Sequence, residues 1–201
     1  MRSFEYNASV MHNWIITTKR TDMYGLINQA IQDLVIQNYG KETWSLIKSD
    51  AHVKVPFFQG LVNYDDQITY DLIKSTSLIL AIPQKEVLEA FGYFWITFTA
   101  QKGYEGFLFS GSATLRDFIM HLNELHEKIE DLFPHYSAPG FSYEDLQEKS
   151  LTLVYESKRS ELEYMLLGIL RGLGTKFKEN IEIEFFPKNQ DQENAKFRLK
   201  F

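Results

Sequence analysis

The sequence predicts an α+β fold, in which an N-terminal helical subdomain precedes a subdomain of one helix and an antiparallel sheet. Apolar residues recur at helical spacing through most of residues 23–132, and the pattern changes to alternation at residues 150–157. Two further runs of strand-forming residues follow near the end of the chain. The 201 residues are 44% hydrophobic and 15% aromatic, which is enough apolar surface for a sizeable core.

Four helices are predicted in the first half of the chain. The first spans Met23 to Tyr39, where Leu26, Ile31 and Val35 keep helical spacing, and Gly40 is expected to end it. The other three are predicted at residues 43–49, 67–81 and 84–98, with Gly92 interrupting the last.

The clearest helix is predicted from Leu115 to Leu132, just before Pro134. One apolar stripe runs along it, formed by Leu115, Phe118, Ile119, Leu122, Leu125, Ile129 and Leu132. His126 lies on this stripe, four residues after Leu122 and three before Ile129. An imidazole on an apolar face is either a core histidine that bonds a backbone carbonyl or a metal ligand.

The remaining elements are predicted from changes in pattern. Residues 135–148 contain Pro139 and Gly140 and are expected to form a loop. A strand is predicted at residues 150–157, and Ser160 with Glu163 forms a capping box that would open a helix to about Gly172. Two more strands are predicted at residues 181–186 and 197–201.

Charge and composition exclude several classes of protein. The net charge is -6 and no cluster of Lys and Arg occurs, which argues against nucleic-acid binding. There is no cysteine, so disulfides and thiolate-bound metal or heme are excluded, and a reducing, cytoplasmic location is favoured. No stretch approaches the roughly 18 apolar residues of a spanning helix, so no membrane insertion is expected.

The first 22 residues are expected to lie outside the folded domain. Their apolar part, residues 14–16, is too short for a signal peptide, and no small-residue cleavage site follows it. The first amphipathic run begins at a second methionine, Met23. We therefore divide the chain into residues 1–22, an extension or a misassigned start, and a single domain over residues 23–201.

A second candidate site is the motif Tyr155-x-Ser157-x-Arg159. Alternation along a strand would send these three side chains to one side. A phenol, a hydroxyl and a guanidinium together suit a ligand with two carboxylates, because a buried charge must be paired and hydrogen-bonded. The alternative interpretation is a solvated strand end.

Together with their surroundings, these signals resemble the heme nitric oxide/oxygen binding (H-NOX) domains. This family includes bacterial stand-alone sensors and the heme domain of soluble guanylate cyclase. The resemblance covers residues 23–201 and rests on motifs found in the family's order. They are Met23-Tyr24-Gly25-Leu26-Ile27, Tyr64-Asp65-Asp66, Leu122-Asn123-Glu124-Leu125-His126, Pro139 with Phe141, Tyr155-x-Ser157-x-Arg159, and Gly168 with Gly172.

The resemblance implies one heme b (iron protoporphyrin IX) sandwiched between the two subdomains. It implies that His126 is the proximal iron ligand and that Tyr155, Ser157 and Arg159 hold the propionates. Pro139 matches the proline that bends the porphyrin, and Ile27 matches an aliphatic contact on the distal side. Their alternatives are a loop-rigidifying proline and an ordinary core isoleucine.

The gas specificity depends on the helix that follows the motif. Oxygen-binding members of the family place a tyrosine over the iron, and Tyr164 is a candidate for that role. The spacing from Tyr155 to Gly168 instead resembles NO-selective members and places Met165 over the heme. Trp95 also resembles a distal aromatic residue of NO-selective members. We therefore expect binding of NO and CO and resistance to O₂, with an O₂ sensor that uses Tyr164 as the alternative.

The resemblance also implies how the signal is passed on. NO would release His126 from the iron, and the heme would flatten against Pro139. The expected output is a separate partner, either a histidine kinase or a cyclic-di-GMP enzyme. Because we find no distal His and Arg pair and no Ser/His/Asp arrangement, we expect a sensor and not an enzyme. A heme oxidase or peroxidase and a heme-free interaction module are the rival functions.

Overall fold

A computed structural model describes residues 22–133, 137–190 and 192–201. Its N-terminal part contains a short antiparallel pair, β1 (Asp22–Tyr24) and β2 (Asn63–Asp65), and the helices α1 (Gly25–Asp50), α2 (Asp66–Leu80) and α3 (Gln84–Gln101). The helices α4 (Glu105–Phe109), α5 (Leu115–Met120) and α6 (Leu122–Leu132) follow. The C-terminal part contains β3 (Gly140–Gln147), β4 (Ser150–Glu156), α7 (Leu162–Phe177), β5 (Glu182–Phe186) and β6 (Ala195–Lys200).

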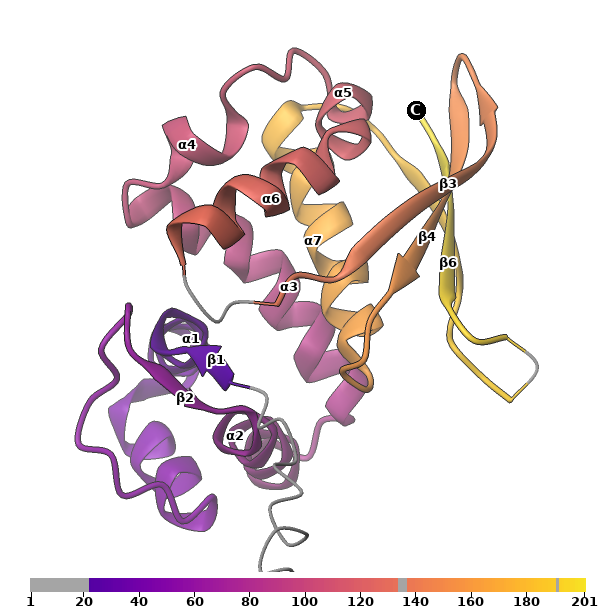
Figure 1. Cartoon of the computed structure of the whole chain (residues 1–201). Coiled ribbons are helices and arrows are strands. Elements are labelled where there is room, and N and C mark those ends of the chain that lie inside the picture. Colours follow the sequence, from indigo (N-terminus) through magenta and orange to yellow (C-terminus); the bar gives the residue numbers. More distant parts are fainter. Residues whose placement is uncertain (1–21, 134–136, 191) are drawn as a thin grey trace, which may run out of the picture.

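The second sheet is antiparallel, with strand order β3-β4-β6-β5. Side chains of α5 and α7 cover one face of it and form an apolar core with Leu153, Phe197 and Leu199. The opposite face carries cross-strand ion pairs, such as Lys196–Glu144. The predicted α+β fold, helices first and an antiparallel sheet with a helix afterwards, is confirmed (Figure 1).

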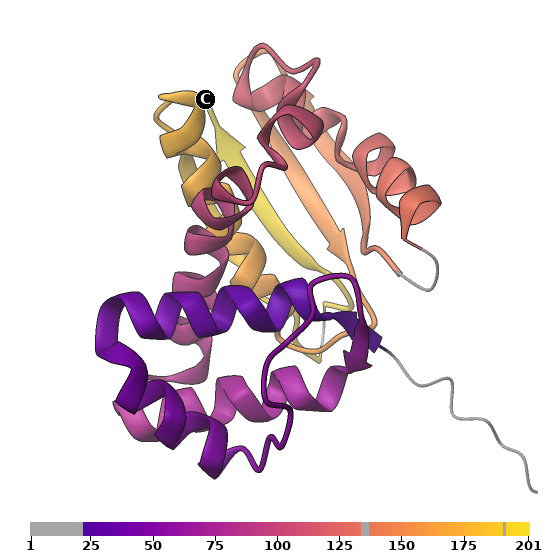
Figure 2. The ribbon, with the colours of Figure 1, turned by 90° about the vertical axis from the view of Figure 1, so that its left-hand side faces the viewer.

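Two cores are joined at the middle of the molecule. One lies between the sheet, α5 and α7, and the other lies among α1, α2 and α3. Figures 1 and 2 show α1 and α2 at one end and the sheet at the other, with α3 and α7 side by side between them. Trp95 and Leu162 pack against both cores.

The prediction that Gly92 interrupts its helix is wrong, because this glycine makes the contact between α3 and α7. A Cβ atom added at Gly92 would lie 1.9 Å from the carbonyl oxygen of Met165. A Cβ atom added at Gly168 would lie 1.9 Å from the carbonyl oxygen of Glu89. The main chains of the two helices therefore touch, which only glycine permits.

The first predicted helix begins two residues later than predicted and ends where predicted. Met23 pairs with Tyr64 in β1, and the helix begins at Gly25, whose amide donates to the carbonyl of Val62 at 2.8 Å. Gly40 ends the first helical stretch, as predicted. It adopts a non-helical φ of 85° and ψ of 168°, which are suited to glycine, and a second helical stretch that contains the predicted residues 43–49 follows it within α1.

The predicted single helix over residues 115–132 is two helices that meet at His121. This residue has φ −102° and ψ 14°, and its ring Nδ1 lies 2.7 Å from the carbonyl oxygen of Asp117. The apolar spacing continues across the break, so periodicity could not reveal it. Of the residues of α6, Leu122 is buried and His126 is half-buried.

Two expectations for the C-terminal part are also wrong. Residues 140–147 form the edge strand β3 and not a loop; half of its residues are polar and exposed, which hid the strand pattern. The capping box does not form, because Glu161 adopts a φ of 63° at the start of α7 and no side chain caps the helix. Glu163 is buried instead, and α7 continues past Gly172 to Phe177.

Residues 1–21 lie outside the described part, so the division at residue 22 stays a prediction. Within the described ranges, no helix combines the length and apolar character needed to cross a membrane.

Candidate functional site

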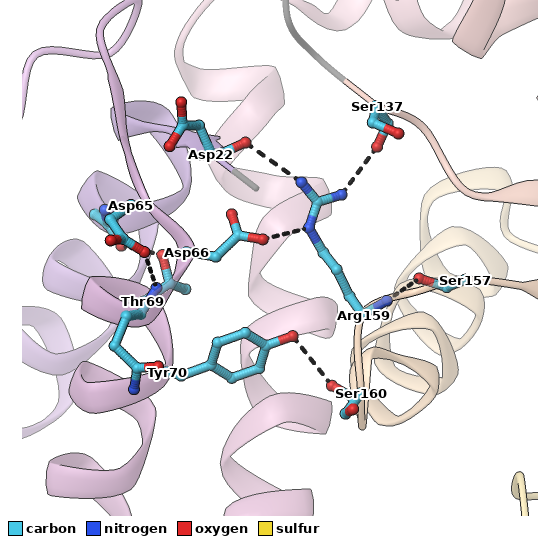
Figure 3. Close-up of polar contacts among 11 residues, drawn as sticks. Asp22, Asp65, Asp66, Thr69, Tyr70, Ser137, Ser157, Arg159 and Ser160 are labelled. Carbon is cyan, nitrogen blue, oxygen red and sulfur yellow. Dashed lines mark hydrogen bonds and ion pairs between the residues drawn. The ribbon is translucent and has the colours of Figure 1, made fainter. Parts of the chain in front are cut away.

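Arg159 joins three segments that are far apart in the sequence. Its Nε donates to Asp66 Oδ2 on α2 at 2.9 Å, and its Nη1 donates to the carbonyl of Ser137 at 2.9 Å. Its Nη2 donates to the carbonyl of Asp22 at 3.3 Å. Figure 3 shows the guanidinium between these acceptors. The side chains of Arg159 and Asp66 are 14% and 6% exposed, so this ion pair is largely buried.

Tyr70 lies one helical turn after Asp66 on α2 and also bonds to the segment that contains Arg159. Its hydroxyl donates to the carbonyl of Ser160 at 3.3 Å (Figure 3). Burial, with a smaller contribution from the charge of Asp66, raises the pKa of Tyr70 to about 12, so the phenol stays neutral and can donate. One face of α2 therefore holds the segment that links β4 to α7.

The three motif residues converge on one small hollow. Tyr155 is buried on β4, its phenol shares a hydrogen bond with Ser157, and burial raises the pKa of the phenol. The Oγ of Ser157 accepts from the amide of Arg159 at 3.1 Å. We call the space that these three residues line, with Glu163 and the β5–β6 connection, the motif hollow; its volume is about 10 Å³.

The route to this convergence differs from the predicted one. Strand alternation was expected to orient all three side chains, but β4 ends at Glu156. Ser157 and Arg159 therefore lie in the segment after the strand, where hydrogen bonds and the ion pair to Asp66 place them.

His126 faces the segment that leads into β3. Its Nδ1 lies 3.4 Å from the carbonyl oxygen of Pro139, and its ring centroid lies 5.4 Å from that of Phe141. Burial lowers the pKa of His126, partly offset by the Pro139 carbonyl and the charge of Glu130, so the neutral imidazole is favoured. An Nδ1–H directed at a carbonyl makes Nε2 the nitrogen that carries the lone pair, as in histidine metal ligands.

Asn123 fixes the relation between α6 and β3, and sequence reasoning gave it no role. Its Nδ2 donates to the carbonyl of Phe141 at 2.8 Å, and its Oδ1 accepts from the amide of Phe141 at 3.1 Å. The ring of Phe141 also lies 5.8 Å from the ring of Tyr155. Phe141 therefore connects His126 with the motif hollow. The role of Asn123 could not be predicted, because no sequence pattern marks an asparagine that bonds to the main chain of a distant residue.

The predicted distal residues lie in the helical core. Ile27, Trp95 and Met165 are partly buried and pack against the apolar cluster of α1, α2 and α3. Tyr164 also contacts this cluster, and its ring packs edge-on against Phe185 of β5, with 5.4 Å between centroids.

The comparison with family models decides the family. A model described as haem-NO-binding matches residues 24–185. The chain belongs to the H-NOX family. H-NOX domains bind heme and act as gas-sensor domains, and this chain has their fold. The predicted family and fold class are confirmed.

Relatives with known names agree with this assignment. Soluble guanylate cyclase gcy-32 of Caenorhabditis elegans is 31% identical over 156 residues, which cover 74% of this chain and 22% of the relative. Soluble guanylate cyclase gcy-34 of the same organism is 27% identical over 177 residues, which cover 86% of this chain and 26% of the relative. The chain thus spans about a quarter of the length of these relatives.

Solved H-NOX structures share the fold at low identity. The H-NOX protein of S. oneidensis in the Fe(II)NO state has a TM-score of 0.80 at 19% identity, over 89% of this chain and 98% of that one. The unliganded Fe(II) H-NOX protein of K. algicida has a TM-score of 0.79 at 20% identity, over 89% and 96%.

The residues present fit a heme in their chemistry. A half-buried neutral imidazole oriented by a carbonyl suits an axial iron ligand, and the motif hollow offers a phenol, a hydroxyl and a guanidinium to a carboxylate. In addition, Asp66 Oδ1 is buried without a hydrogen-bond partner, so the Arg159 contact is incompletely satisfied.

Proposed function

We propose that this domain binds one heme b and senses NO, and also binds CO. His126 would be the iron ligand, and Tyr155, Ser157 and Arg159 would hold the propionates. The observation that carries the proposal is the chain of contacts from His126 through Phe141 to Tyr155, which brings an imidazole and a carboxylate-binding group to one side of the molecule. Bound ferrous heme supplies an iron position opposite His126 where a diatomic gas can bind.

The residues around His126 suit transmission of a signal. The Pro139 carbonyl orients the imidazole, and Asn123 links α6 to the start of β3 through Phe141. Release of His126 from the iron, with flattening of the porphyrin against Pro139, is the proposed trigger. Because Asn123 lies on the same helix as His126, a shift of this histidine would move α6 and β3 together.

The distal side favours NO over O₂ in this proposal. Ile27 and Met165 carry no hydrogen-bond donor, and they pack in the helical core together with Trp95. Tyr164, the donor required by the O₂-sensing alternative, has its ring against Phe185. Without a tyrosine hydroxyl over the iron, the partial negative charge that O₂ develops there lacks the donor that the O₂-sensing alternative requires, whereas NO binds ferrous iron strongly without one.

The output is proposed to be a separate cytoplasmic partner, either a histidine kinase or a cyclic-di-GMP enzyme. This choice of partner rests on what the family resemblance implies. Co-purification from the native cell tests it, and recovery of neither class of partner would contradict it.

Visible spectra test the sensor itself. We expect the full chain, purified with heme supplied, to show a ferrous heme spectrum that changes under NO and under CO and stays unchanged in air. His126→Gly should abolish the iron–histidine signature. A chain that takes up no heme would support the heme-free module, and turnover of peroxide would support the enzyme. A stable complex with O₂ that is lost in Tyr164→Phe would support the O₂ sensor.

A further inference from the structure

The connection between β5 and β6 lies over the motif hollow. Lys188 and Asn194 of this connection line the hollow together with Tyr155 and Ser157. The match to the family model ends at residue 185, so both residues lie beyond the matched region. The hollow therefore contains side chains that the family comparison does not assign.

Gln192 holds this connection in place. Its Nε2 donates to the carbonyl of Phe186 at 3.2 Å and to the carbonyl of Asn194 at 2.7 Å. Its amide donates to the carbonyl of Asn189 at 3.3 Å, and the amide of Asn189 donates back at 3.1 Å. Gln192 thus bonds to the end of β5 and to Asn189 and Asn194, and Lys188 lies between Phe186 and Asn189 in the chain.

The hollow is lined by two cationic and two acidic side chains, and one of the cations, Arg159, is already paired. Arg159 is engaged with Asp66 and with two carbonyls. No ion pair of Lys188 occurs within residues 22–133, 137–190 and 192–201. Two carboxylates also line the hollow: Glu163, which is buried, and Glu193. A ligand with two carboxylates that enters the hollow would be repelled by Glu163 and Glu193. The guanidinium of Arg159, which is already paired with Asp66, would balance the negative charge of this ligand only in part.

We propose that Lys188 binds the heme carboxylates as a second cation, beside Tyr155, Ser157 and Arg159, and that Glu163 opposes them. This inference rests on the proposed heme site and adds residues to it. Lys188 is exposed and lines the hollow, so its long side chain can bring the ammonium to a carboxylate at little cost in burial. Glu163 lowers the affinity through like-charge repulsion.

The rate at which heme is lost to an excess of a heme-scavenging protein tests this, followed by absorbance. Lys188→Ala is expected to lose heme about two- to five-fold faster, since partly exposed ion pairs contribute about 0.2–1 kcal/mol. Glu163→Gln should lose heme more slowly by a similar factor. Lys200→Ala is the matched control, because Lys200 lies on the same sheet and pairs with Glu182 instead.

The dimethyl ester of heme distinguishes an effect of the propionate charges from an effect of the shape of the site. Its carboxylates are blocked, so the Lys188 and Glu163 variants should lose the ester at the wild-type rate. Equal effects on heme and on its ester, or a Lys188→Ala rate equal to that of Lys200→Ala, would overturn the inference. If the wild-type chain takes up no heme at all, the proposed function fails instead, so the two failures are distinguishable.

Discussion

The buried ion pair between Arg159 and Asp66 predicts a large cost for Asp66→Asn. The substitution keeps the shape of the side chain but removes the charge 2.9 Å from the guanidinium. Removing one partner of a buried pair costs about 3–5 kcal/mol, because the other charge is left uncompensated. Arg159 retains the carbonyls of Ser137 and Asp22, and an amide oxygen can still accept from Nε. We therefore expect a loss of about 2–3 kcal/mol in the free energy of unfolding.

Urea unfolding at pH 7 measures this loss, with the m-value as a check that the folded state is intact. Arg159→Gln and the double variant complete a cycle, in which the coupling energy should be about 1–2 kcal/mol. The control is Glu182→Gln, which breaks the exposed pair with Lys200, whose side chains are 63% and 80% exposed, and should leave stability unchanged. A loss below about 1 kcal/mol in Asp66→Asn, which is the range of exposed ion pairs, would refute the reasoning.

Two more predictions concern packing and pH. Gly168→Ala places a methyl group 1.9 Å from the carbonyl oxygen of Glu89, so the free energy of unfolding should fall by about 3 kcal/mol or more. The control is Gly106→Ala, where the added methyl group has open space and the free energy of unfolding should change little. Equal melting temperatures of the two variants would contradict this prediction. Burial raises the pKa of Tyr143, which donates to the carbonyl of Ile119 at 2.7 Å, to about 12. Since an unfolded tyrosine ionises near pH 10, its contribution to stability should be complete below pH 10 and disappear between about pH 10 and 12. Tyr143→Phe should flatten the measured decline in that range, and an unchanged slope would show that other groups cause it.

The parts of the fold with strong periodicity could be predicted from the sequence. The strand β4, the helix α7 and the last two strands lie close to their predicted positions, because strand-forming residues fill β4, which is buried along most of its length, and apolar residues recur with strand or helical spacing in β6 and α7. The edge strand β3 could not be found, since its exposed polar side chains carry no alternation. The break at His121 was hidden because the apolar stripe continues across it.

The candidate site shows a similar limit. The motif residues could be singled out by their chemistry, but the partner of Arg159 lies 93 residues away, and only the folded chain shows that Asp66 is the acceptor. Gly168 was recognised as part of a family motif, yet its physical role is a main-chain contact with α3, which spacing along one helix does not reveal. The role of Asn123 likewise depends on a strand that was not predicted.

The direct contact between α3 and α7 constrains how this domain can move. At Gly92 and Gly168 no side chain separates the helices, so sliding one past the other would drive a methylene or carbonyl into the opposite backbone. The pair should therefore move as one rigid unit. Met165 lies on one of these helices and Trp95 on the other, so a displacement imposed at either residue is carried to both cores at once, and rotation of the whole pair is the motion that the packing allows.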